Sequence, residues 1–220
     1  MPDLILASAS PRRHALIQLL RRRVTVRPTA VDEESVTHPD PVVNVVRTAR
    51  LKAEAAAAGA DRDGIIIAAD TTVVLDGEML NKPAGAAEAR AMLRRLRGRT
   101  HYVHTGLVLL DAGRGCAASA LSTTAVTMRD YDDAEIDAYV ATGDPLDKAG
   151  SYAIQHSGFR PVARLDGCYT GVVGFPLCRL AGALQELGVS VDLAVATESA
   201  DYRDCATCLQ LLDGLLPAEG

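Results

Sequence analysis

The sequence lacks several features that would each point to a particular class of protein. No apolar run approaches the roughly 20 residues of a membrane-spanning helix. The first residues, Met1-Pro2-Asp3-Leu4, carry no basic region of the kind that begins a signal peptide. Five cysteines, an odd number with no repeated spacing, argue against a disulfide framework. We therefore expect a cytoplasmic protein with reduced thiols and no membrane partner.

Lysine is scarce in this chain. Of the 23 basic residues only Lys52, Lys82 and Lys148 are lysines, and the rest are arginines. Because arginine fills most positions where either cation would serve, a remaining lysine is a candidate for a site that needs a compact ammonium aimed at one oxygen. The alternative for each of the three is that a lysine occurs there by chance and has no special role.

Length and charge set the remaining bounds. A net charge of -5 and an isoelectric point near 5.5 disfavour nonspecific binding to nucleic acid. A length of 220 residues allows one domain, or one domain of two lobes. We expect a domain over residues 1–190 and a partly helical tail over residues 191–220, with no internal repeat.

Hydrophobic runs and turn signals predict alternating strands and helices, and hence an α/β fold. The apolar run Ile65–Ala69 has the pattern of a central strand covered on both faces. Other strands are expected at 4–7, 24–26, 73–75 and 78–80, and in a long hairpin formed by 101–111 and 116–128. Helices are expected at 11–20, 42–58, 86–96, 135–141 and 176–187, while 32–35 and most of 150–174 are expected to be loops and short strands.

The first candidate site is the turn Ser8-Ala9-Ser10-Pro11-Arg12-Arg13 between a strand and a helix. Ser10 is the expected N-cap of that helix, and free backbone N–H groups beside two guanidinium groups form a place where anions bind. It is not a Walker loop, because Gly-x4-Gly-Lys-Ser/Thr occurs nowhere in the chain. Simple helix capping with solvated arginines is the alternative.

The second candidate is a set of carboxylates. Asp70 is expected to end the strand Ile65–Ala69, and ligands in open α/β sheets bind at the carboxyl ends of strands. With the loop Asp32-Glu33-Glu34 it could supply oxygen ligands to Mg²⁺ or Mn²⁺. The phosphatases that form an aspartyl phosphate need a second Asp two residues after the first, and Thr72 occupies that position here.

The third candidate is the lysines themselves. Lys52 shares a helix stripe with Val45 and Ala49, which predicts that it points inward and is paired. Lys82 is made rigid by the proline that follows it, and Lys148 stands beside an aspartate that could pair with it locally. With the two arginines of the turn, these cations could neutralise a polyphosphate during P–O cleavage.

Cysteine and histidine give weaker signals. Cys205-x-x-Cys208 would need about two further ligands to hold zinc, and none lies near in sequence, so a plain helix is expected. His101 and His104 are three residues apart in an expected strand and therefore face opposite sides. We interpret the histidines as structural or surface residues.

Together these motifs resemble the Maf family of nucleoside triphosphate pyrophosphatases in both order and spacing, over about residues 3 to 187. The blocks that carry the resemblance are Leu6-Ala7-Ser8-Ala9-Ser10-Pro11-Arg12-Arg13, Ala69-Asp70-Thr71, Gly77-Glu78-Met79-Leu80-Asn81-Lys82-Pro83, Asp147-Lys148-Ala149-Gly150 with Ile154-Gln155, and Val173-Gly174-Phe175-Pro176-Leu177.

The resemblance implies a two-lobed α/β fold of the Maf and ITPase-like kind around a mixed, twisted sheet. It also implies cleavage of a nucleoside triphosphate to the monophosphate and pyrophosphate, with Mg²⁺ or Mn²⁺, by a possible homodimer. On this basis Asp70 and Glu33 are the expected catalytic carboxylates and metal ligands, and Lys52 and Lys82 the expected catalytic lysines. The substrate- and phosphate-binding residues implied are Ser8, Ser10, Arg12, Arg13, Thr71, Lys148 and Gln155.

The resemblance extends to one branch of the family. Arg12, Thr71 and Gln155 match the three positions at which the dTTP/UTP-cleaving branch carries Arg, Thr and Gln. The branch that cleaves 7-methyl-GTP shows Trp and Gln at the first two. This chain departs from the family pattern at Ala69, Asn81, Phe175 and His156-Ser157, the last beside the expected base pocket.

Two other classes fit part of the pattern. A nucleotide-binding regulator of cell division could keep the phosphate turn and lose the carboxylates, but Glu33 and Asp70 are both present. A nucleotidyl- or phosphotransferase would share the metal and phosphate chemistry, but no acceptor site is readable. The sequence therefore favours a hydrolase.

Overall fold

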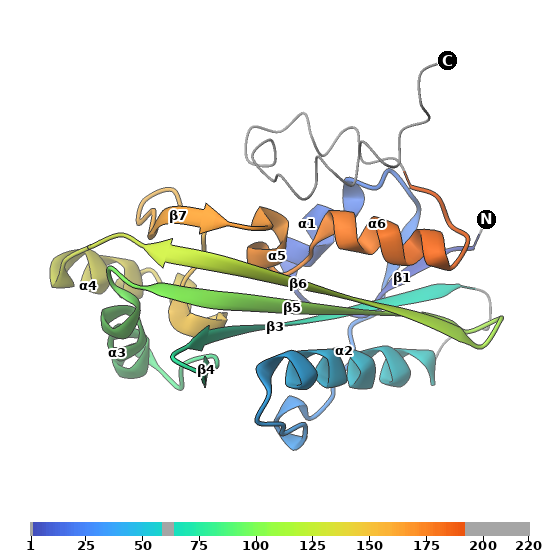
Figure 1. Cartoon of the computed structure of the whole chain (residues 1–220), viewed down its shortest axis with the longest axis horizontal. Helices are drawn as coiled ribbons and strands as arrows, with labels where there is room; N and C mark the ends of the chain where they lie inside the picture. The colour runs from blue at the N-terminus through green and yellow to red at the C-terminus, as the bar shows by residue number, and fades with distance from the viewer. Residues whose placement is uncertain (1, 59–63, 192–220) are drawn as a thin grey trace, which may run out of the picture.

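The computed structural model describes residues 2–58 and 64–191, and within them the core is one mixed sheet with helices on both faces (Figure 1). Its strand order is β2-β1-β3-β5-β6-β7, and β4 pairs with β3 off this path. The strands are β1 (Leu4–Leu6), β2 (Val24–Val26), β3 (Ile65–Leu75), β4 (Glu78–Leu80), β5 (Thr100–Asp111), β6 (Cys116–Met128) and β7 (Val162–Asp166).

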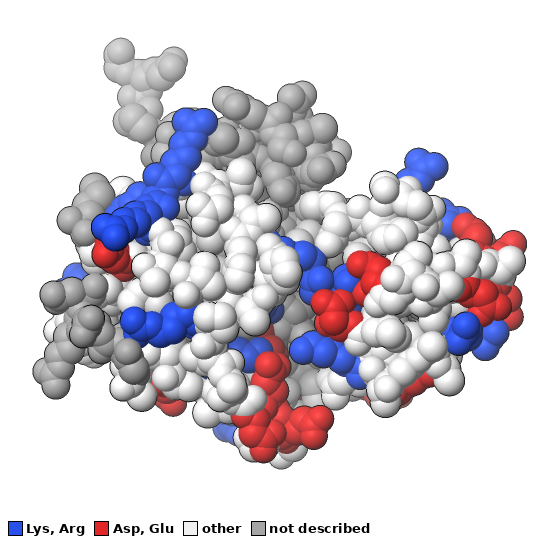
Figure 2. All heavy atoms as spheres, turned by 180° about the vertical axis from the view of Figure 1, so that it is seen from behind, with Lys and Arg blue, Asp and Glu red and all other residues white. Residues whose placement is uncertain are grey.

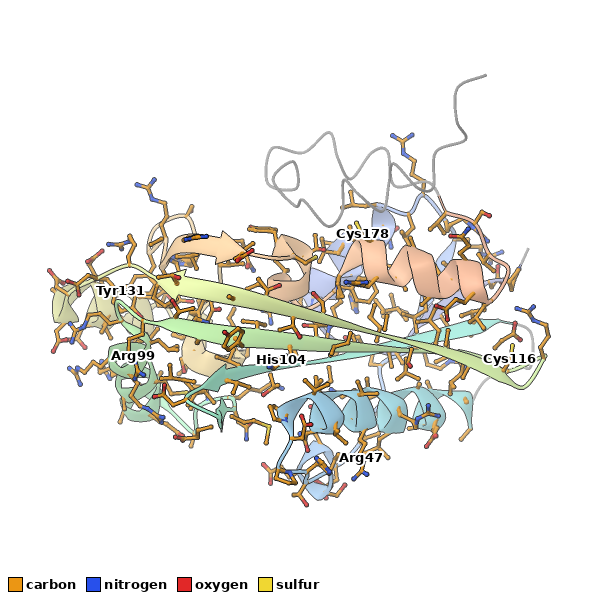
Figure 3. All side chains as sticks on the ribbon, viewed as in Figure 1. Arg47, Arg99, His104, Cys116, Tyr131 and Cys178 are labelled. Carbon is orange, nitrogen blue, oxygen red and sulfur yellow. The ribbon has the colours of Figure 1, made fainter. Side chains whose placement is uncertain are left out.

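The sheet is parallel at one edge and antiparallel elsewhere. β1 pairs in parallel with both β2 and β3, as expected of strands joined through helices. β5 and β6 form the predicted long hairpin, which runs the length of the molecule from near Arg99 to Cys116 (Figure 3). The predicted hairpin after β3 is also present, with Asp76 and Gly77 at φ of 53° and 83°, as a two-residue type I′ turn requires.

The helices divide between the two faces and one end of the sheet (Figure 1). α2 lies on one face, α1, α5 and α6 lie towards the other, and α3 and α4 pack together at one end. The helices are α1 (Pro11–Gln18), α2 (Pro41–Ala57), α3 (Ala86–Leu96), α4 (Asp133–Ala141), α5 (Tyr169–Val173) and α6 (Leu177–Glu186), and short 3-10 turns occur at η1 (Glu33–Ser35), η2 (Asp144–Asp147) and η3 (Ala149–Ser151).

Strand β3 passes through the cores of two lobes, which confirms the two-lobed α/β fold. In its first half, Ile65 and Ile67 pack in the core with α1 and α6, while Ile66 faces α2. In its second half, Val73 and Leu75 belong to a separate core under α3 and α4. The polar segment 70–72 therefore lies where one apolar core ends and the next begins.

The prediction that Asp70 ends its strand is wrong. β3 continues to Leu75, because β5 pairs with it without interruption as far as Tyr102 and β-branched residues suit the pleated backbone. What ends near Asp70 is the pairing with the neighbouring strands: β1 pairs with β3 only as far as Ile67, and β4 pairs with β3 only from Val73 onward. The edge of β3 is thus open between these two positions, and Asp70 lies beside the opening.

Smaller differences from the predicted elements have local causes. The first helix ends at Gln18 rather than at residue 20, and residues 33–35 form a 3-10 turn because Asp32 accepts hydrogen bonds from two following backbone N–H groups. The helix α5 was not predicted. Gly59, Cys205, Cys208 and the tail beyond residue 191 lie outside the described residues. Among the helices that are described, none has the length and apolar character needed to cross a membrane.

Candidate active site

A cleft of about 910 Å³ opens at the exposed edge of β3, between the two lobes. Figure 2 shows acidic and basic side chains gathered close together in the middle of the face opposite to that of Figure 1. Every residue that the sequence indicated as catalytic or substrate-binding lines this one cleft: Ser8, Ser10, Arg12, Arg13, Glu33, Lys52, Asp70, Thr71, Lys82, Lys148 and Gln155. Segments separated by almost 150 positions in the chain therefore meet at one place.

Lys52 is the centre of the ionic arrangement. Its Nζ lies 2.8 Å from Asp70 Oδ1 and 2.9 Å from Glu33 Oε2, and the residue is only 8% exposed. Arg47 lies on the exposed side of the same helix (Figure 3). The predicted inward-pointing, paired Lys52 is confirmed.

The charges of this cluster favour an ionised Glu33. Partial burial alone would raise the pKa of Glu33, but the charge and hydrogen bond of Lys52, with smaller contributions from Lys82 and Arg13, lower it overall. Glu33 is therefore an anion at neutral pH although it lies in a cleft. Two carboxylates that converge on one ammonium also leave oxygens that could hold a small divalent cation.

The turn before α1 is organised by its serines. Ser10 is the N-cap of the helix, and its hydroxyl accepts a long 3.5 Å hydrogen bond from the backbone N–H of Arg13, while Pro11 occupies the first helical position. Ser8 is buried, and its Oγ accepts from the backbone N–H of Ser10 at 3.2 Å. The predicted cap is confirmed, and the N-terminus of α1 opens into the cleft.

Arg13 is not a solvated arginine. Its Nη1 donates to the carbonyl of Ala69 at 2.8 Å, its Nη2 to Thr71 Oγ1 at 3.2 Å, and its Nε to the carbonyl of Gly174 at 2.9 Å. Burial lowers the pKa of Arg13 and the charge of Asp70 opposes that shift. The guanidinium thus forms hydrogen bonds to the edge of β3 and to the end of α5, and it connects both to the turn before α1.

Gly174 is required at that junction. It has a φ of +107°, and a Cβ there would lie 3.1 Å from Thr71 Oγ1. A side chain at this position would be strained and would also press on the contact that Arg13 makes with β3. The glycine therefore allows α5 to end directly against the cleft.

Arg12 and Lys148 meet on the opposite wall. Arg12 Nη1 lies 3.6 Å from Asp147 Oδ2, and Lys148 Nζ lies 2.7 Å from Asp147 Oδ1 and 2.9 Å from Asp144 Oδ1. Lys148 is 8% exposed. The local ion pair considered for this lysine is confirmed, and it holds the wall of the cleft together.

Tyr139 extends this wall towards Gln155. Its hydroxyl donates to Asp144 at 2.6 Å and accepts from the backbone N–H of Ala153 at 3.0 Å. Partial burial alone would raise the pKa of Asp144, but its hydrogen bonds to Tyr139 and to a lysine lower it overall. The segment that carries Gln155 is therefore fixed by a charged hydrogen-bond chain.

Lys82 and Gln155 differ from the other polar residues of the cleft. Both are exposed, and neither makes an ion pair or a hydrogen bond to another residue that the structure describes. All three lysines of the chain are described, and Lys82 alone among them has no carboxylate partner there. Its ammonium is available to an incoming anion.

His101 and His104 do not line the cleft, whereas His38 does. His101 and His104 face opposite sides of β5, as predicted: His101 Nε2 lies 2.7 Å from the hydroxyl of Tyr152, and His104 Nδ1 lies 2.9 Å from Thr123 Oγ1. Burial lowers the pKa of His101 to about 4, so it is neutral at physiological pH. No cluster of three or more His, Cys, Asp or Glu side chains suited to a metal occurs within 2–58 and 64–191.

Several polar residues of the cleft were missed by the sequence reasoning, and three of them lie near its charged centre. Asn44 and Thr48 precede Lys52 on α2 at intervals of four residues, and Thr72 follows Asp70 by two residues on β3. Helix and strand periodicity place each of them on the same face as its charged neighbour. That periodicity could be read from the sequence. Nothing in the sequence, however, distinguished these three as residues of the site rather than ordinary polar residues of a helix or strand.

The fold and the cleft define a class: an α/β protein of two lobes with an ion-paired polar cleft at the open edge of a central strand. Within that class, the family model described as Maf-like protein matches residues 3–187. The chain belongs to the Maf family.

Curated relatives of known name agree with this assignment. The chain is 45% identical over 191 residues to the dTTP/UTP pyrophosphatase of Moorella thermoacetica, covering 87% of this chain and 98% of that one. It is 47% identical over 184 residues to the dTTP/UTP pyrophosphatase of Salinibacter ruber, covering 83% and 89%. A solved structure described as the Staphylococcus aureus Ham1 protein aligns over 97% of this chain and 100% of its own, with a TM-score of 0.48 and 15% identity.

Proposed function

We propose that this protein hydrolyses a nucleoside triphosphate, dTTP or UTP, to the monophosphate and pyrophosphate. The observation that carries the proposal is the cleft itself, in which two carboxylates, held by Lys52, face a free Lys82 and the N-terminus of α1. Carboxylates on one side of the cleft and cationic groups on the other suit attack by water on one phosphate of a bound polyphosphate. The names of the relatives support the choice of nucleotide.

The substrate has one favourable orientation in this cleft. Its phosphates would lie against the turn that carries Ser8 and Ser10, where backbone N–H groups, the helix N-terminus and Arg13 favour negative charge. Lys82 would bind the phosphates from the other side. The base and sugar would then reach Gln155 and Arg12 across the cleft.

Asp70 and Glu33 would hold a divalent metal, Mg²⁺ or Mn²⁺, and this donor set suits such an ion. Magnesium is usually held by one or two carboxylates, with waters and substrate phosphates as the other ligands. The described residues contain no cluster of three or more candidate ligands, so they hold no closed site of the structural zinc type. When bound, the metal would supply neutralisation of charge on the phosphate oxygens.

The chemical step needs one base and one leaving group. Asp70 accepts a proton from a water molecule while the oxygen of that water attacks the α-phosphorus. The bond from that phosphorus to the oxygen bridging to the β-phosphate then breaks, and its electron pair leaves with pyrophosphate. Lys82 and Arg13 stabilise the negative charge on the leaving pyrophosphate.

Incubation of the purified protein with a panel of nucleoside triphosphates and Mg²⁺ or Mn²⁺, with separation of the products, tests this proposal. We expect thymidine or uridine monophosphate together with pyrophosphate. Asp70→Asn should reduce turnover at least about 100-fold, whereas Asp137→Asn, at an exposed pair with Arg90, should not. Release of nucleoside diphosphate and phosphate would contradict α-phosphorus attack, and binding without turnover would favour the regulator of cell division.

A further inference from the structure

Two side-chain oxygen atoms of the cleft are buried without a hydrogen-bond partner. Three side-chain atoms in the described part of the chain have this property, and Asn44 Oδ1 and Thr72 Oγ1 belong to residues that line the cleft. Thr72 is only 5% exposed. A buried hydroxyl without a partner is unfavourable, and in a functional cleft its usual explanation is a ligand or an ordered water.

Thr72 faces the same side of the sheet as Asp70. Alternate residues of a strand share a face, and Asp70 is bonded to Lys52 of α2 on that side. Thr71 points to the other side, where its Oγ1 meets Arg13 and lies 2.9 Å from Thr105 Oγ1. The hydroxyl of Thr72 is therefore the next polar group along β3 after the Asp70 carboxylate, about 6.7 Å away in backbone position.

One row of polar side chains on α2 lines the cleft together with Thr72 but makes no hydrogen bond to it. Asn44, Thr48 and Lys52 repeat at four-residue intervals on α2 and all line the cleft. Thr48 Oγ1 donates to the backbone carbonyl of Asn44 at 3.0 Å. Neither Thr48 nor Asn44 makes a hydrogen bond to Thr72. The polar groups of the helix and of the strand therefore suit a water that bonds to several of them.

We propose that Thr72 positions the water that attacks the α-phosphorus, by a hydrogen bond between its hydroxyl and that water beside Asp70. This inference rests on the proposed function. The water donates one hydrogen to Thr72 Oγ1 and gives its other proton to Asp70 as its oxygen bonds to phosphorus and pyrophosphate leaves.

The proposal predicts an unusual combination of effects for Thr72→Val, which keeps the shape and removes the hydroxyl. Loss of one positioning hydrogen bond should lower kcat for dTTP about tenfold. KM should stay within about twofold, because the substrate itself does not touch the hydroxyl. Thr72→Ser should restore kcat, which a purely structural role of the methyl group would not allow.

Stability should move in the opposite direction to activity. Thr72→Val removes a buried hydroxyl without a protein partner, so its Tm should equal or exceed that of the wild type. Thr124→Val is the matched control: Thr124 is also buried in the sheet, but its Oγ1 accepts from the backbone N–H of Cys168 at 2.9 Å. That variant should have a lower Tm.

Each other outcome overturns the proposal in a distinct way. Wild-type turnover of dTTP with an equally active Thr72→Val would remove the positioning role and leave the proposed function intact. A raised KM with unchanged kcat would place the hydroxyl against the substrate instead of the water. Thr72→Val with a Tm clearly below that of the wild type would show that the hydroxyl has a structural partner. No wild-type turnover of any nucleotide would remove both proposals.

Discussion

Lys52→Met tests the ionic centre of the cleft directly. The substitution keeps the apolar stem of a residue that is 8% exposed and removes the ammonium that contacts Asp70 and Glu33. The two carboxylates then lose the ammonium that pairs with both of them, and only the weaker effects of Lys82 and Arg13 remain. The expected result is a protein that is folded but less stable at neutral pH, with little or no turnover.

The size of the effect follows from burial. Removing one partner of a fully buried ion pair costs about 3–5 kcal/mol. The side chains of Asp70 and Glu33 are 15% and 44% exposed, so solvent screens part of the repulsion. We therefore expect a loss of about 2 kcal/mol in the free energy of unfolding. For a chain of this size that corresponds to a Tm lower by about 4–8 °C.

Urea unfolding at two pH values measures this loss. The pKa of Glu33 in the folded protein is lowered from 4.5, so its stabilising contribution is complete above that value and is lost as pH falls through the folded pKa. The difference between wild type and Lys52→Met should thus be full at pH 7 and shrink below about pH 4.5. Arg50→Met, at an exposed pair with Glu54 on the same helix, should change stability by less than about 0.5 kcal/mol. Equal stability of the two variants at pH 7 would refute the reasoning.

Three further predictions concern other walls of the cleft and its core. Arg13→Lys keeps the positive charge but cannot keep the three hydrogen bonds to Ala69, Thr71 and Gly174. The value of kcat/KM for dTTP should therefore fall about 100-fold. Tyr139→Phe loses its bonds to Asp144 and to the backbone of Ala153, which should raise KM and lower stability by about 1–2 kcal/mol in urea unfolding. Burial lowers the pKa of His101 from 6.5 to about 4, so the wild type should lose about 3 kcal/mol of stability as pH falls through that interval, whereas His101→Gln should not.

Lys52 shows what helix periodicity can predict. Its apolar stripe predicted an inward, paired lysine, and the structure confirms this because the stripe is a property of one helix. Asp70 and Glu33 were candidate site residues, but the sequence did not predict that they are the partners of Lys52. Local pattern was sufficient where a single element decides the direction of a side chain.

Asp70 and Arg13 show where local pattern fails. The end of a strand depends on how far its neighbours extend, and β5 continues beside β3 well past Asp70. Arg13 bonds to the carbonyl of Gly174, a residue 161 positions away, at the end of a five-residue helix too short to give a periodic signal. Contacts of such sequence separation come from the assembled fold and not from any segment of it.

The measurement that most directly tests α-phosphorus attack is hydrolysis of dTTP in ¹⁸O-labelled water, with mass analysis of both products. Attack at the α-phosphorus predicts one labelled oxygen in the thymidine monophosphate and none in the pyrophosphate. Label in the pyrophosphate would place the attack on the β-phosphorus. Thymidine diphosphate with labelled phosphate would place it on the γ-phosphorus. The first result would contradict the mechanism of α-phosphorus attack, and the second would also contradict the function proposed for this cleft.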